Sequence, residues 1–347
     1  MHGAFYNAGV MLPAILVVLM AGAPPHPPEF WRAVAAHDYA VPPGEDLTAL
    51  VTELEGFLAS SDPEVRDEIG YSTLAAWIYE KRAVEPPLLR TLANDLMGNL
   101  TQGVGDAESD GVFRRSFSAL TLSVVVARDN ASPVLSRDEF RRIEAAALGY
   151  LAAERDVRGY DPQKGWMHSA AHTADLLKFL ARSRYLEPAE QPRLLDGVAR
   201  KLAAAPTVFT HGEDERLARA VLSIVNRADF DRAAFQAWAA RTRPARLPAR
   251  PSASDLAGAQ NVKNALSKLE VLLATRPEPS ESVAAARDAV RPALKDLFDH
   301  GTVTVPTIPG WSVQRYGKLP ADGNVMLNLP LGAIVPELNA PLFAVAV

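Results

Sequence analysis

The sequence contains no cysteine. This absence excludes disulfide bonds, thiolate catalysis and zinc sites built on cysteine sulfur. It does not indicate a compartment, because proteins of reducing and of oxidising compartments can both lack cysteine. Any chemistry that the chain performs must therefore depend on other side chains.

Aromatic residues are scarce, at 7% of the chain, and runs of β-branched residues are few. Alanine and leucine dominate instead, which favours helices over sheets. The formal net charge of −5 lacks the basic excess that neutralises phosphates, so the composition excludes a general nucleic-acid binder. With 347 residues, the chain can bury a substantial core in one large domain or two ordinary ones.

An apolar run occupies Gly9 to Met20 and ends in Ala21-Gly22-Ala23. Its length and its small-residue ending are typical of a secretory signal peptide, although no Lys or Arg precedes it. The run is shorter than the ~20 residues that span a membrane, so the chain would contact a membrane only through this segment, if it stays uncleaved. We expect export to the periplasm or out of the cell, with a cytoplasmic location as the alternative.

The rest of the chain is predicted to form a single helical domain. A signal-like segment and a Pro-rich spacer occupy residues 1–28, the helical domain covers 29–298, and an irregular tail covers 299–347. A Pro/Arg-rich linker near 241–251 interrupts the domain.

Apolar residues recur at helical spacing in about a dozen segments, and no convincing strand precedes the tail. Helix-start signals support this pattern, such as Asp62-Pro63 and the capping box that begins at Ser136. The predicted fold class is all-α. We favour an irregular α-α superhelix of stacked HEAT-like hairpins, since no segment repeats at a fixed period, and a closed α/α toroid is the alternative.

One stretch combines several scarce functional residue types. A loop over 158–165, which contains glycine and proline, precedes a segment with no helix breaker as far as Leu180, so we predict a loop and then a helix. At about 100° per residue, His168, His172 and Asp175 fall within one narrow stripe of that helix. Two imidazoles and a carboxylate would therefore point the same way.

Motifs lie in this stretch and on both sides of it. In chain order they are Arg66-Asp67-Glu68-Ile69-Gly70-Tyr71-Ser72-Thr73-Leu74, Phe113-Arg114-Arg115-Ser116-Phe117-Ser118-Ala119-Leu120, Arg158-Gly159-Tyr160, Gly165-Trp166-Met167-His168, His172-Thr173-Ala174-Asp175-Leu176-Leu177 and His211-Gly212-Glu213-Asp214-Glu215-Arg216-Leu217-Ala218. Together they resemble the bacterial family catalogued as domain of unknown function 2785, over roughly Asp38 to Phe298. The resemblance implies membership of that family, and it implies no activity, because none is established for the family.

Ligand binding is the function that we favour for the central stretch. A groove on the concave face of the superhelix would bind a small molecule or a peptide. The candidate ligand-binding residues are Trp166, His168, His172, Asp175, Arg114, Arg115, Asp67, Glu68, His211 and Glu215. The structural alternative is a buried polar network, in which the imidazoles and Asp175 satisfy loop carbonyls and Arg114 or Arg115 and fix how the helices stack. We interpret the chain as a helical-array binding or scaffold protein.

A divalent metal site is a further interpretation of the same residues. His168 and His172, four residues apart, could bind one metal ion together with Asp175 and with Glu215 or His211 from a neighbouring helix. A serine replaces the glutamate of the H-E-x-x-H motif, which excludes a zincin-type site. No cofactor other than this metal is suggested by the sequence.

A hydrolase-like enzyme is the alternative function. His168, His172 and Asp175 are its catalytic candidates, with Asp175 orienting one imidazole as the base. Ser116 or Ser169 would be the nucleophile, although the nucleophile-elbow pattern G-x-S-x-G is absent.

Two charged pairs precede the central stretch in the motifs. Arg114 and Arg115 lie at a predicted helix start, where cations are poorly placed for the helix dipole, so an acidic partner or an anionic ligand is expected. Asp67 and Glu68 also lie near a helix start, where carboxylates complement the dipole. Alternatively, one of these two carboxylates faces the same cavity as His168.

Overall fold

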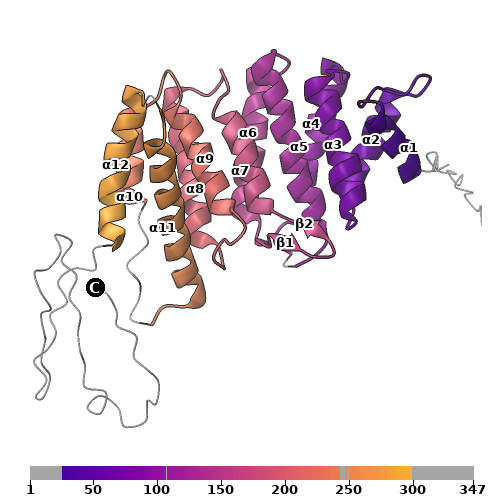
Figure 1. Cartoon of the computed structure of the whole chain (residues 1–347). Helices are drawn as coiled ribbons and strands as arrows, with labels where there is room; N and C mark the ends of the chain where they lie inside the picture. Colours follow the sequence, from indigo (N-terminus) through magenta and orange to yellow (C-terminus); the bar gives the residue numbers. More distant parts are fainter. Residues whose placement is uncertain (1–25, 107, 243–246, 248–249, 278, 299–347) are drawn as a thin grey trace, which may run out of the picture.

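The computed structural model describes residues 26–106, 108–242, 247, 250–277 and 279–298. Most of these residues lie in helices (Figure 1), which confirms the all-α prediction. The apolar run and the tail lie outside the described residues, so the interpretations of both segments stay predictions. Within the described ranges, no helix is long and apolar enough to cross a membrane.

The first half of the fold is entirely helical between its loops. Its elements are α1 (Pro28–Ala36), α2 (Leu47–Phe57), η1 (Glu64–Tyr71), α3 (Ser72–Ala75), η2 (Ala76–Glu80), α4 (Pro86–Asn99), α5 (Gly111–Ala131) and α6 (Arg137–Ala153). η1, α3 and η2 follow one another without a break, and η1 and η2 have the wider turns of a π-helix. Such turns often occur at functional sites.

The second half begins with a small hairpin and continues with helices. Its elements are β1 (Tyr160–Asp161), β2 (Gly165–Trp166), α7 (Ser169–Leu180), the 3-10 turn η3 (Pro188–Glu190), α8 (Gln191–Ala204), α9 (Glu213–Val225), α10 (Arg232–Arg241), α11 (Ala253–Ala274) and α12 (Glu281–Phe298). The Pro/Arg-rich segment falls between α10 and α11, and part of it lies outside the described residues.

Helix starts follow the signals in the sequence. Ser136 Oγ accepts a hydrogen bond from the Glu139 backbone N at 3.2 Å, and the Glu139 carboxylate accepts one from the Ser136 backbone N at 2.7 Å. This reciprocal pair is the predicted capping box. Asp62 accepts from the Glu64 backbone N at 2.9 Å, so it caps the helix that begins with η1.

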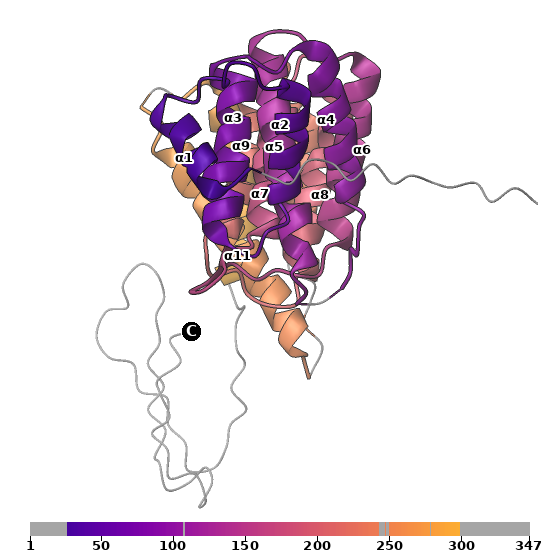
Figure 2. The same cartoon turned by 90° about the vertical axis from the view of Figure 1, so that its right-hand side faces the viewer.

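The helices alternate between two layers. α2, α4, α6, α8 and α10 contact one another in chain order in one layer, and η1 to η2, α5, α7, α9 and α11 do so in the other. α1 and α12 lie at opposite ends of the row in Figure 1, and Figure 2 looks along the row. The described helices therefore do not close into a toroid. A superhelical twist of this row stays a prediction.

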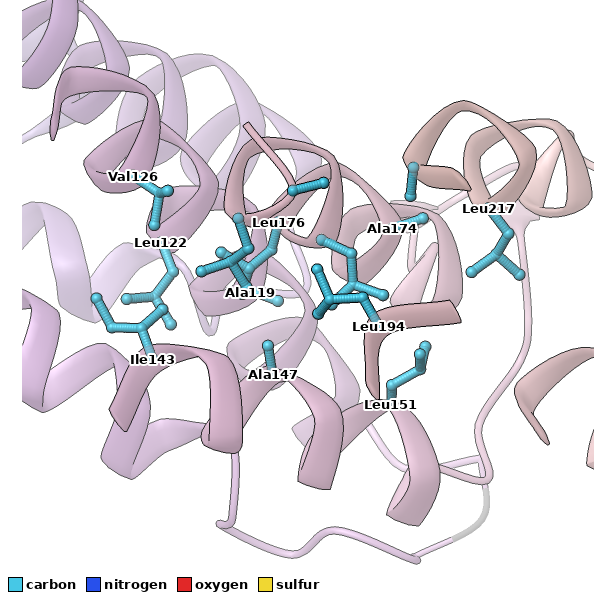
Figure 3. Close-up of a cluster of buried hydrophobic side chains, with 14 of the residues drawn as sticks. Ala119, Leu122, Val126, Ile143, Ala147, Leu151, Ala174, Leu176, Leu194 and Leu217 are labelled. Atoms are coloured by element: carbon cyan, nitrogen blue, oxygen red, sulfur yellow. The ribbon is translucent and has the colours of Figure 1, made fainter. Parts of the chain in front are cut away.

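The core fills the space between the two layers. Figure 3 shows its central part, where apolar side chains from α5 to α9 meet: Ala119, Leu122, Val126, Ile143, Ala147, Leu151, Ala174, Leu176, Leu194 and Leu217. All ten are at most 2% exposed. Burying one leucine fully contributes about 1.5–3 kcal/mol. α7 lies between α5 and α9 in this packing and gives the segments around it a rigid support.

Candidate functional site

The hairpin of β1 and β2 was not predicted: three of its four residues lie in the segment interpreted as a loop, and Trp166 lies in the segment predicted to be helical, whereas α7 begins only at Ser169. Tyr160 pairs with Trp166 and Asp161 with Gly165 in antiparallel register. Asp161 Oδ1 accepts hydrogen bonds from the backbone N of Gln163 and of Lys164, both at 2.8 Å, which closes the turn. The hairpin lies at the lower ends of α5 and α7 in Figure 1.

His168 links the hairpin to α7. Its backbone is left-handed, with φ at 48°, so it lies just before the helix and not within the predicted helical stripe. Its Nε2 lies 3.0 Å from the His211 carbonyl oxygen and 3.6 Å from Glu213 Oε1. Both atoms are acceptors, so Nε2 carries the proton. Burial lowers the pKa of His168, and the nearby Glu213 carboxylate only partly opposes this.

His172 lies in the first turn of α7 and is buried. Ser116 Oγ donates to the Met167 carbonyl oxygen, so His172 Nδ1, at 2.8 Å from that hydroxyl, must donate to it. This tautomer leaves the lone pair on Nε2. Burial, reinforced by the positive charges of His168 and Arg216, lowers the pKa of His172 well below its usual value. The imidazole is therefore neutral at neutral pH.

Rings stack outward from these imidazoles to the surface. The His168 ring is 5.6 Å from His172, centroid to centroid, and Trp166 stacks on it at 4.4 Å. Tyr160 lies 4.9 Å from Trp166. Tyr160 is 49% exposed and Trp166 39%, whereas both imidazoles are 6% exposed. We call Tyr160, Trp166, His168, His172 and His211 the aromatic site.

Gly159 allows His211 to approach the hairpin closely. A Cβ atom added at Gly159 would lie 2.2 Å from His211 Nδ1 and 2.4 Å from its Cγ. His211 also lies edge-on to Trp166 at 6.0 Å, and its carbonyl accepts from His168. Glycine is therefore required in the Arg158-Gly159-Tyr160 motif because the His211 ring occupies the space of a side chain.

Asp175 does not orient either imidazole. Lys178 Nζ donates to one of its carboxylate oxygens at 2.8 Å, and Arg216 Nη1 donates to the other. The carboxylate is thus paired with two cations, and the predicted role of Asp175 beside a catalytic base has no support in this geometry. The charge of Arg216 acts on both imidazoles, which places this partly exposed guanidinium beside the aromatic site.

Both predicted nucleophiles, Ser116 and Ser169, are buried, and each hydroxyl donates a hydrogen bond to a backbone carbonyl. Ser116 is 0% exposed and donates to the Met167 carbonyl, and Ser169 is 1% exposed and donates to the Asp156 carbonyl. A substrate could reach neither hydroxyl without opening the core. The arrangement therefore gives no support to a serine-based hydrolase.

The tandem arginines lie apart from the aromatic site. Arg115 is 0% exposed, and its Nε donates to Glu154 Oε2 at 2.6 Å. This is the acidic partner that the sequence led us to expect. Arg114 is partly buried, and its charge acts on Glu55. The polar network exists, but its ion pairs differ from those predicted, since Asp175 pairs with neither of these arginines.

The remaining acidic candidates occupy different positions. Asp67 pairs with Arg66 Nε at 2.7 Å, beside Gly165 of the hairpin, and burial raises its pKa. Glu68 is exposed. Glu215 pairs with Arg219 at 2.7 Å. Among the described residues, no three His, Asp or Glu side chains are grouped so that they could hold a metal ion, so the predicted metal site gains no support.

Several residues of this region were not singled out from the sequence. Tyr160, Gly159 and Arg216 stood within the quoted motifs, but nothing in the motifs showed that they meet. Glu213 is 1% exposed, and its Oε2 accepts from the His211 backbone N at 2.9 Å. A buried acid that starts a helix is not distinguishable, in sequence, from an exposed one.

Comparison with known proteins identifies a family and little else. The family model described as a protein of unknown function (DUF2785) matches residues 100–273, which is half of the chain. The match contains the whole aromatic site, whereas the Arg66–Leu74 motif lies outside it. No curated protein and no solved structure matches the chain. The chain therefore belongs to the DUF2785 family of proteins of unknown function.

Proposed function

We propose that the chain is a binding protein, and that a small molecule or a peptide with a flat apolar group binds on Tyr160 and Trp166. The observation that carries the proposal is the exposure of this aromatic pair, at 49% and 39%, on top of two buried imidazoles. Aromatic rings provide a large contact area and are enriched at binding surfaces.

The pair is held in place before any ligand arrives. The short hairpin fixes both backbones, and the His168 ring supports Trp166 from below at 4.4 Å. His168 is itself fixed by its hydrogen bond to the His211 carbonyl. Binding to a preorganised surface avoids the entropic cost of ordering side chains, so this rigidity favours affinity.

The surroundings add a polar contribution. Arg216 is 44% exposed in its side chain, and with Lys178 it places two cations around the single carboxylate of Asp175. A peptide carboxylate or another acceptor next to the flat group would find a donor there. The lone pair on His172 Nε2 is the corresponding acceptor of the site.

A fragment screen followed by ligand-observed NMR tests the proposal. We expect Trp166→Ala to weaken aromatic-ligand binding about three- to tenfold, because a stacked aromatic pair contributes ~0.5–1.5 kcal/mol. Tyr79→Ala is the matched control, since Tyr79 is 47% exposed on η2, outside the aromatic site. Equal binding by wild type and Trp166→Ala would contradict the proposal.

We further propose that the protein is exported, on the strength of the run from Gly9 to Met20 and its small-residue ending. Mass spectrometry of the protein produced in a secreting host tests this. A mature chain that lacks the first ~23 residues supports export, and an intact N-terminus on protein found only in the cytoplasm contradicts it.

A further inference from the structure

A second candidate site adjoins the aromatic site. A cavity of about 1270 Å³ lies beside the C-terminal ends of α6 and α8, between the segments 154–160 and 200–211. Tyr160 and His211, which belong to the aromatic site, also line this cavity. This volume suits an organic molecule and far exceeds what one inorganic anion fills.

The cavity wall contains a buried amine. Lys201, on α8, is 6% exposed, and its Nζ donates to the Glu154 carbonyl oxygen at 2.7 Å. An ammonium group has three donor protons. Within the described part of the chain, one of them has a protein partner, so two remain for a molecule in the cavity.

The two carboxylates whose charges act on Lys201, Glu154 and Asp156, are already paired with arginines. Glu154 Oε2 accepts from Arg115 Nε at 2.6 Å, and Asp156 accepts from Arg158 Nε at 2.9 Å. Arg158 Nη2 adds a second bond to Asp156, at 2.5 Å. Three cations thus share two anions, and Lys201 is the cation without a carboxylate hydrogen-bonded to it. A buried charge of this kind is stabilised by an anion.

The remaining walls combine positive charge at the rim with apolar side chains. Arg155, Arg200 and Glu108 line the cavity and are exposed. Leu151, Val157 and Val208 contribute apolar surface, and further apolar wall comes from alanines of α8. An anion with an apolar body matches this lining better than a fully hydrated one does.

We propose that the cavity binds a small organic carboxylate, which accepts hydrogen bonds from Lys201 Nζ and places its apolar part against Leu151, Val157 and Val208. The proposal is independent of the proposed function, because it rests on Lys201 and not on Trp166. The pKa of Lys201, lowered to about 8 by burial, agrees with an ammonium that lacks its own counter-ion.

Calorimetric titration with octanoate and benzoate tests the proposal, with inorganic phosphate as the comparison. We expect Lys201→Met, which keeps the chain length and removes the charge, to weaken carboxylate binding about tenfold or more. Lys295→Met, at an exposed position of α12 that does not line the cavity, is the matched control and should bind as wild type does. Trp166→Ala should also bind as wild type, which separates this site from the aromatic one.

Measuring carboxylate affinity of the wild-type protein at several pH values provides a second test. It needs no substitution, so a misfolded variant cannot affect the result. Between pH 8 and 9.5, Lys201 loses its proton. The other charged or titratable residues that line the cavity are Glu108, Glu154, Arg155, Asp156, Arg158, Tyr160, Arg200 and His211. Carboxylate affinity should fall about fifteenfold over this interval, because the protonated fraction of Lys201 falls from about one half to about 3%. The proposal is overturned if neither carboxylate binds, if Lys201→Met binds them as wild type does, if phosphate binds more tightly than both, or if affinity is constant over the interval.

Discussion

Replacing Gly159 by alanine tests the packing that joins the hairpin to His211. The added Cβ would lie 2.2 Å from His211 Nδ1, 2.4 Å from its Cγ and 2.7 Å from its Cβ. No rotation of the new methyl group relieves contacts with atoms so close to the His211 backbone. Either the ring or the whole 210–212 segment must move away, and the hydrogen bond from His168 Nε2 to the His211 carbonyl would then lengthen or break.

The expected cost has two parts. Overpacking of a tight contact destabilises a protein by about 1–3 kcal/mol, and loss of one hydrogen bond adds about 1 kcal/mol. The φ angle of Gly159 is not in the left-handed region, so backbone strain contributes nothing further. We expect Gly159→Ala to lower the free energy of unfolding by about 2–4 kcal/mol.

Urea unfolding followed by circular dichroism measures this change, and two variants make the result specific. Gly149→Ala is the matched control, since a Cβ at this exposed position of α6 meets nothing within 4 Å. It should raise stability by about 0.5–1 kcal/mol, because alanine favours a helix. Adding His211→Ala to Gly159→Ala should restore more than half of the lost stability. Wild-type stability of Gly159→Ala, or no recovery in the double variant, would refute the packing argument.

Three other predictions concern buried charges and protonation. Burial lowers the pKa of Lys201 from 10.5 to about 8, which destabilises the fold by about 3 kcal/mol below pH 8 and by progressively less up to pH 10.5. Lys201→Met removes this cost but loses one hydrogen bond, so its free energy of unfolding in urea at pH 7 should exceed that of the wild type by about 2 kcal/mol. A less stable variant would contradict this. His172 should remain neutral and protonated on Nδ1 at pH 6.5, where an ordinary histidine is half charged; because its folded pKa lies below the unfolded one, its contribution to stability falls as pH drops below 6.5. Nitrogen NMR of the ring measures this state, and an imidazolium signal for His172 at pH 6.5 would show that the burial argument fails. Glu154→Gln leaves the fully buried Arg115 without its counter-ion and should reduce the free energy of unfolding by about 3–5 kcal/mol, whereas a loss under 1 kcal/mol in urea would mean that the pair is solvated.

The sequence was sufficient for the fold class because helix signals are local. A capping box such as Ser136 with Glu139 involves residues three apart, and apolar spacing reports which face is buried whatever the partner helix. The hairpin was missed because strands of two residues leave no periodic signal. Its geometry depends on side-chain bonds of Asp161 within the turn and on the packing of Gly159 against a segment that lies some 50 residues further along.

The sequence brought two of the candidate residues together but did not predict the bonds that they and the other candidates make. The helical stripe placed His168 and His172 together, and the rings do lie 5.6 Å apart. The sequence did not predict which charged residues form ion pairs. Asp175 pairs with Arg216 of α9, and Arg115 pairs with Glu154 at the end of α6. Such pairs depend on which helices become neighbours. Lys201 had no sequence signal at all, because a lysine on an amphipathic helix is ordinarily solvated.

The two-layer row has a consequence for how stability is distributed along the chain. Most helices contact their neighbours in the row and nothing beyond them, so cooperativity is passed from pair to pair, as in repeat proteins. Opening should then begin at α1 and α12, which stand at the ends of the row of described helices, and proceed inward. The aromatic site is carried by segments around α5, α7 and α9 near the middle of the row. Fraying at either end therefore leaves its geometry intact until the central helices separate.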